Sequence, residues 1–208
     1  MQLINLNQIK KTYHTKELEV HSIEDISLDI NEGEILSIVG PSGCGKSTLL
    51  NMLTKLDFPT SGFIRDNKPL IIGYMMQNDA LLPWLTVEDN ALLGLKLKHE
   101  LSKETKEYVY DLLKRYGLFE FKNSYPDSLS GGMRQRIALI RTLAIHPNIL
   151  LLDEPFSKLD IDSRITISDD VYQIIQELGI TTVLISHDIA EALSLSDRIV
   201  VLSKRPAT

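Results

Sequence analysis

The residues best suited to chemistry form one glycine-rich segment, Gly40-Pro41-Ser42-Gly43-Cys44-Gly45-Lys46-Ser47-Thr48. In the spacing G-x-x-x-x-G-K-S, glycines let backbone N–H groups converge on phosphate oxygens, Lys46 reaches the terminal phosphates, and the Ser47 hydroxyl can bind Mg²⁺. A helix beginning here would turn its free N–H groups and its positive dipole end toward the same anion. The segment therefore predicts a phosphate-binding loop. The alternative is a glycine-rich turn without a ligand.

Cys44 lies inside this loop and is the single cysteine of the chain, which excludes an internal disulfide framework. A helix N-terminus can make a thiol reactive, so a bound ligand could protect Cys44 from alkylation. The alternative, which we favour, is a small residue that fills a permissive position.

Polar side chains also follow apolar runs that read as buried strands. Asp153 and Glu154 follow Ile149–Leu152, at the edge of a parallel sheet where ligands bind. Asp153 is suited to hold Mg²⁺ through water. Side-chain alternation would point Glu154 elsewhere, where it could act as general base for an attacking water. The alternative is a solvated pair at a strand end. Gln77 and His187 also follow apolar runs, although each alone could be an ordinary surface residue.

A second segment that could bind an anion is Leu129-Ser130-Gly131-Gly132-Met133. Ser130 predicts the N-cap of a helix whose first turn offers free N–H groups. Capping alone gives little reason for two glycines, because each weakens a helix by roughly 1 kcal/mol.

These segments must be positioned by an α/β fold. Alternating patterns over residues 3–12 and 20–30 predict antiparallel strands with one buried face, and Ile35–Val39 predicts a strand buried on both faces. Residues 78–145 change to helical spacing, with Ser102 as an expected N-cap. From residue 146 strands alternate with helices, which indicates a mainly parallel sheet.

Composition narrows the function classes. The 208 residues suffice for one α/β domain, and 43% hydrophobic with 24% charged residues is ordinary for a globular protein. The net charge of −6 argues against a nucleic-acid binder. We see neither a secretory signal pattern at the start nor 18 consecutive apolar residues, so we expect any membrane role to come through a partner.

Together these segments resemble the ATP-binding subunits of ABC transporters over essentially the whole chain. The motifs that match follow in the family's order: Walker A (Gly40–Thr48), the Q-loop (Gln77), the signature motif (Leu129–Met133), Walker B (Ile149–Asp153) with the catalytic glutamate (Glu154), the D-loop (Ser157-Lys158-Leu159-Asp160) and the switch histidine (His187). Two positions depart from the family's usual pattern, Met133 in place of Gln and Lys158 in place of Ala.

The resemblance implies a P-loop NTPase core with a mainly parallel sheet, an N-terminal antiparallel β subdomain and an inserted helical subdomain. It implies one domain over residues 1–208, with the core in 1–77 and 146–208 and the helical signature subdomain in 78–145. The implied ligands are ATP and Mg²⁺, with the metal held by Ser47, Gln77 and Asp153. Lys46, Gln77, Glu154 and His187 are implied in catalysis. ATP contacts are implied for Tyr13, as the aromatic residue that stacks on adenine, for the Walker A residues Gly40 to Thr48, and for Ser130, Gly131, Gly132 and Asp160.

The implied assembly is a homodimer, or a pair of ATPase subunits, around two ATP molecules, so that Ser130 to Gly132 contact ATP held by the other subunit. It works on transmembrane permease subunits, with a solute-binding protein in the full importer, and lies in the cytoplasm on the inner face of the membrane. No nucleic acid is expected.

The segment Leu81-Leu82-Pro83-Trp84, after the Q-loop, resembles the branch that serves nitrate, sulfonate and taurine importers. Trp84 could be an exposed knuckle for a membrane subunit or could pack in the helical subdomain, and the sequence leaves both open. Two other function classes remain as alternatives. One is an ABC-type ATPase acting on nucleic acid or ribosomes, and the other is a P-loop kinase or GTPase, which would leave Ser130 to Gly132 and His187 unexplained.

Overall fold

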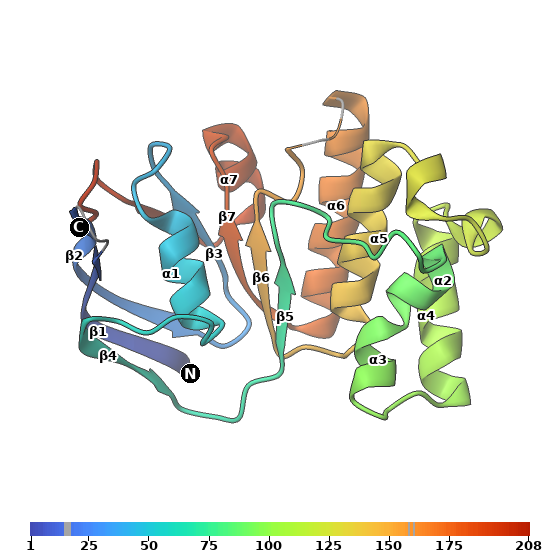
Figure 1. Ribbon diagram of the computed structural model, residues 1–208, viewed down its shortest axis with the longest axis horizontal. Coiled ribbons are helices and arrows are strands. Elements are labelled where there is room, and N and C mark those ends of the chain that lie inside the picture. The colour runs from blue at the N-terminus through green and yellow to red at the C-terminus, as the bar shows by residue number, and fades with distance from the viewer. Residues whose placement is uncertain (15–17, 158, 160) are drawn as a thin grey trace.

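The computed structural model describes residues 1–14, 18–157, 159 and 161–208, without the side chains of 161–163. Figure 1 shows an antiparallel sheet at one end, a parallel sheet in the middle and a cluster of helices at the other end. The predicted α/β fold, with an antiparallel β part at the N-terminus and a helical insertion, is confirmed.

The antiparallel sheet has the order β2-β1-β4, formed by β1 (Gln2–His14), β2 (Glu19–Asn31) and β4 (Ser61–Asp66). β1 pairs with β2 along its length, with Leu6 opposite Leu28 and Tyr13 opposite Val20. The alternation predicted for residues 3–12 and 20–30 thus reflects one face turned to the core and one to solvent.

The parallel sheet has the order β5-β6-β7-β3-β8. Its strands are β3 (Ile35–Val39), β5 (Ile72–Met75), β6 (Ile149–Asp153), β7 (Thr181–Ile185) and β8 (Arg198–Val201). All residues of β3, β6 and β7 are buried, because helices or the antiparallel sheet cover both faces. Parallel pairing brings the carboxyl ends of these strands to one edge.

The helices are α1 (Lys46–Leu53), α2 (Val87–Ala91), α3 (Leu93–Leu97), α4 (Lys103–Arg115), α5 (Gly131–Leu143), α6 (Ile161–Leu178) and α7 (Ile189–Leu195), with 3₁₀ turns at Phe119–Phe121 and Pro126–Ser128. Ser102 caps α4 as predicted, accepting a hydrogen bond from the backbone of Thr105. α5 ends at Leu143, and His146 then takes a positive φ of 47° before Pro147.

The core is divided by the parallel sheet. Leu36 and Ile38 of β3 pack with α1 and the antiparallel sheet, whereas Leu150 and Leu152 of β6 pack with α5 and α6. α1 and α5 therefore lie on opposite faces of one sheet, while both begin at the edge where the strands end (Figure 1).

Candidate active site

The carboxyl edge of the parallel sheet opens on a cleft of about 660 Å³. Residues from both sheets and from the glycine-rich loop line it: Tyr13, Val20, Ser22, Ser42, Gly43, Gly45, Lys46, Ser47, Thr48, Gln77, Asp153, Glu154, His187 and Arg205. Segments more than 100 residues apart in sequence thus meet at one site. Most of the side chains predicted from the sequence are among them.

The glycine-rich loop joins β3 to α1 and depends on the backbone freedom of glycine. Gly43 and Gly45 have positive φ values of 73° and 117°, and a Cβ on Gly45 would lie 3.0 Å from the carbonyl oxygen of Ser22. Gly45 is also the N-cap residue of α1, so it has no side chain to occupy the N–H groups of the first turn. These N–H groups remain available to an anion.

Lys46 is held at the base of this loop. Its ammonium donates hydrogen bonds to the carbonyl oxygens of Gly40 at 2.7 Å and Pro41 at 3.0 Å, and the residue is 8% exposed. An ammonium group has three N–H donors, so the same group can keep these bonds and still donate to a phosphate in the cleft. A buried cation with this geometry favours a polyanion beside it.

The thiol of Cys44 points away from the cleft and into the apolar core. Cys44 is 1% exposed and packs in the apolar cluster with Leu49 and Leu202. A Cβ on Gly40 would lie 2.9 Å from its Sγ. The structure supports the small-residue interpretation, and contact with a ligand would come from the Cys44 backbone.

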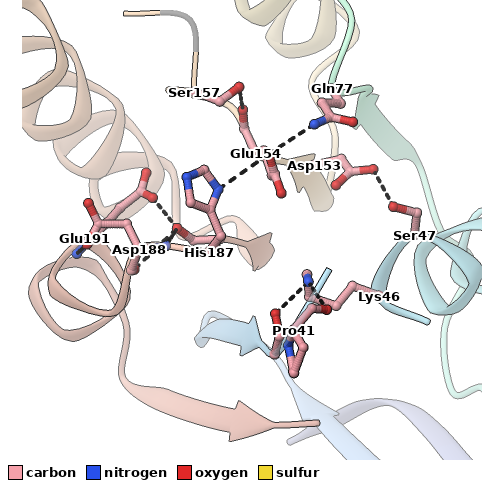
Figure 2. A network of polar contacts seen from close by, with 12 residues as sticks. Pro41, Lys46, Ser47, Gln77, Asp153, Glu154, Ser157, His187, Asp188 and Glu191 are labelled. Carbon is pink, nitrogen blue, oxygen red and sulfur yellow. Dashed lines mark hydrogen bonds and ion pairs between the residues drawn. The ribbon is translucent and has the colours of Figure 1, made fainter. Parts of the chain in front are cut away.

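Ser47 and Asp153 form the part of the cleft that suits a metal ion. The Ser47 hydroxyl donates to Oδ2 of Asp153 at 3.1 Å (Figure 2). Burial raises the pKa of Asp153, the Glu154 carboxylate raises it further, and the Ser47 bond and Lys46 lower it. A hydroxyl beside a buried carboxylate is a hard oxygen donor set, and a divalent cation would compensate the cost of burying this charge. The residues present therefore fit Mg²⁺.

Glu154 is the centre of a polar network (Figure 2). Its Oε2 accepts a hydrogen bond from Nε2 of Gln77 at 3.0 Å and lies 3.4 Å from Nδ1 of His187. β6 ends at Asp153, and Glu154 takes a positive φ of 49°. This turn brings both acidic side chains to the same cleft, so the strand alternation expected to separate Asp153 from Glu154 does not extend to this position.

That backbone conformation is rare for a non-glycine residue and costs on the order of 1–3 kcal/mol. Hydrogen bonds on both sides of Glu154 stabilise it. Its N–H donates to the carbonyl oxygen of Ile185 at 3.0 Å, and its carbonyl accepts from the Ser157 hydroxyl at 3.0 Å. The chain thus maintains a strained residue to place one carboxylate.

Tyr13 lines the cleft from β1. Its hydroxyl donates to Oδ2 of Asp57 at 2.8 Å, and the Lys11 ammonium lies 4.7 Å from its ring centroid. Burial raises the pKa of Tyr13, a bond from Thr48 lowers it, and the Asp57 carboxylate raises it further. The hydroxyl is therefore neutral and fixed, and the ring is available as a flat apolar surface.

The second predicted anion-binding segment lies elsewhere. Ser130 caps α5 by accepting from the N–H of Met133 at 3.3 Å, and Ser130, Gly131 and Gly132 are not among the lining residues of the cleft. A Cβ on Gly132 would lie 2.9 Å from Cδ2 of Leu159, so packing explains this glycine. At Gly131 the nearest described atom would be 4.0 Å away. Packing among the described residues therefore gives no reason for Gly131.

Sequence reasoning missed several lining residues, and two predicted positions cannot be placed. Val20 and Ser22 of β2 and Arg205 line the cleft without belonging to a recognisable motif. For Val20 a signal was available, because antiparallel pairing of the two predicted strands brings Val20 opposite Tyr13. Asp160, expected to contact nucleotide, and Lys158 lie outside the described residues. Met133 packs partly buried against the helical core.

Comparison with known proteins decides the family. The sequence pattern described as "ABC transporter" matches residues 23–157, which include the loop, Gln77, Ser130, Asp153 and Glu154. The chain belongs to the ABC transporter family. It is an ATP-binding and ATP-hydrolysing subunit of such a transporter.

Relatives and solved structures agree with this assignment. This ABC subunit is 40% identical to the nitrate transport protein NasD of Klebsiella oxytoca, over 99% of this chain and 82% of that protein. It is 41% identical to the aliphatic sulfonates import ATP-binding protein SsuB 1 of Pseudomonas savastanoi, over 89% and 76%. A dimeric, post-hydrolysis structure of the ATP-binding cassette MJ0796 with ADP and Pi superposes with a TM-score of 0.88 at 33% identity, over 99% and 98%.

None of the described helices of this ABC subunit is long and apolar enough to cross a membrane.

Proposed function

We propose that the cleft binds Mg²⁺ and ATP and that Glu154 is the general base for hydrolysis. The observation that carries this proposal is the fixed carboxylate of Glu154, held between Gln77 and His187 opposite a phosphate-binding loop. Lys46 and the backbone of residues 40–48 hold the phosphates, and Tyr13 lies against adenine. Ser47, Gln77 and Asp153 hold Mg²⁺, which neutralises phosphate charge when bound. Asp160 is proposed as a further nucleotide contact.

In this proposal Oε2 of Glu154 accepts a proton from the water that attacks the γ-phosphorus, while the bond to the β-phosphate oxygen breaks. Gln77 and His187 touch that same oxygen, so they orient the carboxylate toward the water. His187 is 62% exposed at its side chain and extends toward the end of the cleft where the γ-phosphate would lie.

We infer that the active assembly is a two-fold dimer around two ATP molecules. α1 and α5 lie on opposite faces of the sheet, so the phosphate-binding loop and Ser130 to Gly132 of one chain do not share a nucleotide. A second copy turned by two-fold symmetry presents its own Ser130, Gly131 and Gly132 to the first copy's ATP. The dimeric MJ0796 structure supports this arrangement.

We further propose that the subunit powers small-solute import, of the kind that its nitrate and sulfonate relatives are named for. Permease subunits would span the membrane, a solute-binding protein would deliver solute, and this subunit would lie on the inner, cytoplasmic face. Residues 78–145 would act as the helical signature subdomain and 1–77 with 146–208 as the core. The net charge of −6 disfavours the alternative of an ABC-type ATPase on nucleic acid or ribosomes.

Glu154→Gln tests the base assignment. It removes the carboxylate and keeps the shape, so hydrolysis should fall by roughly 10²- to 10⁴-fold. ATP binding should persist, and an ATP-bound dimer should accumulate in size-exclusion chromatography. Glu120→Gln, at an exposed carboxylate of the 3₁₀ turn, is the matched control. An unchanged hydrolysis rate in Glu154→Gln would overturn the assignment.

The assembly needs a separate test. After expression in the native host, the tagged subunit should co-purify with membrane permease subunits. Recovery of ribosomes or nucleic acid instead would support the alternative function.

A further inference from the structure

The C-terminal residues of the described chain return to the cleft. After β8, residues 203–208 turn back, with the backbone of Thr208 bonded to the Ser203 hydroxyl at 3.0 Å. Ala207 then pairs with β2, since its N–H donates to Ser22 at 3.1 Å and its carbonyl accepts from Glu24 at 2.9 Å. Leu202 and Ala207 are 2% and 0% exposed, so this short segment is anchored at both ends.

The anchored segment presents Arg205 to the cleft that Tyr13 and Val20 also line. Nε of Arg205 donates to the carbonyl oxygen of His21 at 3.1 Å. In the β1–β2 ladder His21 pairs with Thr12, the position next to the Tyr13–Val20 pair. Arg205 is therefore attached beside Tyr13, on the side of the cleft that the antiparallel sheet forms, and not at the β5, β6 and β7 ends that carry Gln77, Glu154 and His187.

The chemistry of this side chain matches a nucleoside. Within the described part of the chain, the guanidinium uses Nε for its bond to the protein, which leaves both terminal nitrogens for a ligand. A guanidinium is planar and weakly hydrated, so it stacks on aromatic faces and donates to ribose oxygens. The phosphates would be held by Lys46, which also lines the cleft, and by the N–H groups of the loop.

We propose that Arg205 is a nucleotide-binding residue at the nucleoside end of the cleft, where its guanidinium lies against the base and ribose of the nucleotide whose other side contacts Tyr13. This inference rests on the proposed nucleotide site and adds a contact from the segment after β8. The planar guanidinium would serve any purine, so it would strengthen nucleotide binding without distinguishing ATP from GTP.

The test compares Arg205→Ala and Arg205→Lys with a control variant, Lys204→Ala. This control removes the same charge at the neighbouring position, and Lys204 does not line the cleft. Calorimetry on the full chain would measure dissociation constants for ATP, ADP and inorganic tripolyphosphate. Arg205→Ala should weaken ATP and ADP by the same factor, roughly three- to tenfold, and leave tripolyphosphate unchanged. Arg205→Lys should also bind ATP and ADP more weakly than the wild type, because an ammonium has no planar face. Lys204→Ala should match the wild type.

In steady-state kinetics Arg205→Ala should raise KM and leave kcat unchanged, which a general loss of structure would not do. If Arg205→Ala fails to fold, Arg205→Gln keeps an amide that can bond His21. Equal nucleotide affinity in Arg205→Ala or Arg205→Gln and the wild type would overturn the proposal. Equal weakening of tripolyphosphate would also overturn it, because the contact would then be to phosphate. Failure of the wild type to bind nucleotide would instead refute the proposed function.

Discussion

Nε2 of Gln77 donates a hydrogen bond to Oε2 of Glu154 at 3.0 Å, across the end of the β5–β6 pair. The same oxygen lies 3.4 Å from Nδ1 of His187. One carboxylate oxygen is thus fixed from two strand ends on either side of β6. This geometry makes the orientation of Glu154 depend on residues that are far apart in sequence.

Gln77→Ala should therefore lower the ATP hydrolysis rate without unfolding the subunit. Loss of one hydrogen bond to a charged group is worth about 1.5–3 kcal/mol, and we expect a rate reduction of at least about tenfold. ATP affinity measured without Mg²⁺ should change little, because Gln77 contacts the carboxylate of Glu154 and not the phosphate-binding loop. Gln173→Ala, at an exposed position of α6, is the control. A hydrolysis rate equal to that of the control would show that Glu154 does not need this contact.

Gly131→Ala should have opposite effects on stability and on assembly. The added Cβ meets no described atom closer than 4.0 Å, so within one chain the substitution should raise the free energy of unfolding by up to about 1 kcal/mol. Across the proposed dimer it would meet the partner's ATP, so ATP-dependent dimerisation of the Glu154→Gln variant should weaken. Urea denaturation without nucleotide and sedimentation with ATP would measure the two effects.

Gly132→Ala is the comparison, because its Cβ would lie 2.9 Å from Leu159 and the expected stabilisation should be offset within the chain. Undiminished ATP-dependent dimerisation in Gly131→Ala would contradict the proposed interface.

The helices and strands, and most of the residues that line the cleft, could be predicted from the sequence because each depends on a local pattern. Buried strands such as Ile149–Asp153 show as apolar runs, and the phosphate-binding loop has a fixed spacing. The sequence did not predict that the side chain of Glu154 enters the same cleft as that of Asp153, because this depends on one positive φ after the strand end. Arg205 did not follow either, since a backbone pairing between Ala207 and β2 places it there. Such long-range contacts leave no periodic signal.

Trp84 illustrates a question that only the structure could decide. The residue is 69% exposed, so the alternative that it packs in the helical subdomain is wrong. Asn90, which is 0% exposed, holds this loop instead. Its Nδ2 donates to the carbonyl oxygens of Leu82 at 3.1 Å and Leu85 at 3.1 Å, and its Oδ1 accepts from the N–H of Leu82 at 2.8 Å. The loop is therefore rigid while its tryptophan faces outward.

Trp84→Ala should leave stability within about 0.5 kcal/mol of the wild type and leave ATP hydrolysis of the isolated subunit unchanged. Transport by the assembled transporter should fall, because an exposed tryptophan suits a partner interface. Asn90→Ala, in contrast, leaves buried backbone groups unpaired and should cost about 2–3 kcal/mol. Thermal denaturation and transport assays would separate the two variants. Normal transport by Trp84→Ala would remove the coupling role.

Glu191 of α7 provides a pH-dependent prediction. Its carboxylate accepts a hydrogen bond from the Ser186 hydroxyl, next to His187 (Figure 2). Burial raises the pKa of Glu191 above its ordinary value of 4.5, and the Asp188 carboxylate raises it further, while the Ser186 bond, Arg164 and His187 lower it. The folded chain therefore holds this proton more tightly than the unfolded chain does.

Consequently Glu191 should contribute stability at acid pH that is lost as the pH rises from about 4.5 through the raised pKa of the folded state. Glu191→Gln carries no titrating group and keeps an amide oxygen for Ser186. Its free energy of unfolding should match the wild type at low pH and exceed it at pH 8. Urea titrations across this range would measure the difference, with Glu120→Gln, at an exposed carboxylate, as control. Wild type and Glu191→Gln curves that run parallel would show that the carboxylate titrates alike in both states, because only a shifted pKa makes their separation depend on pH.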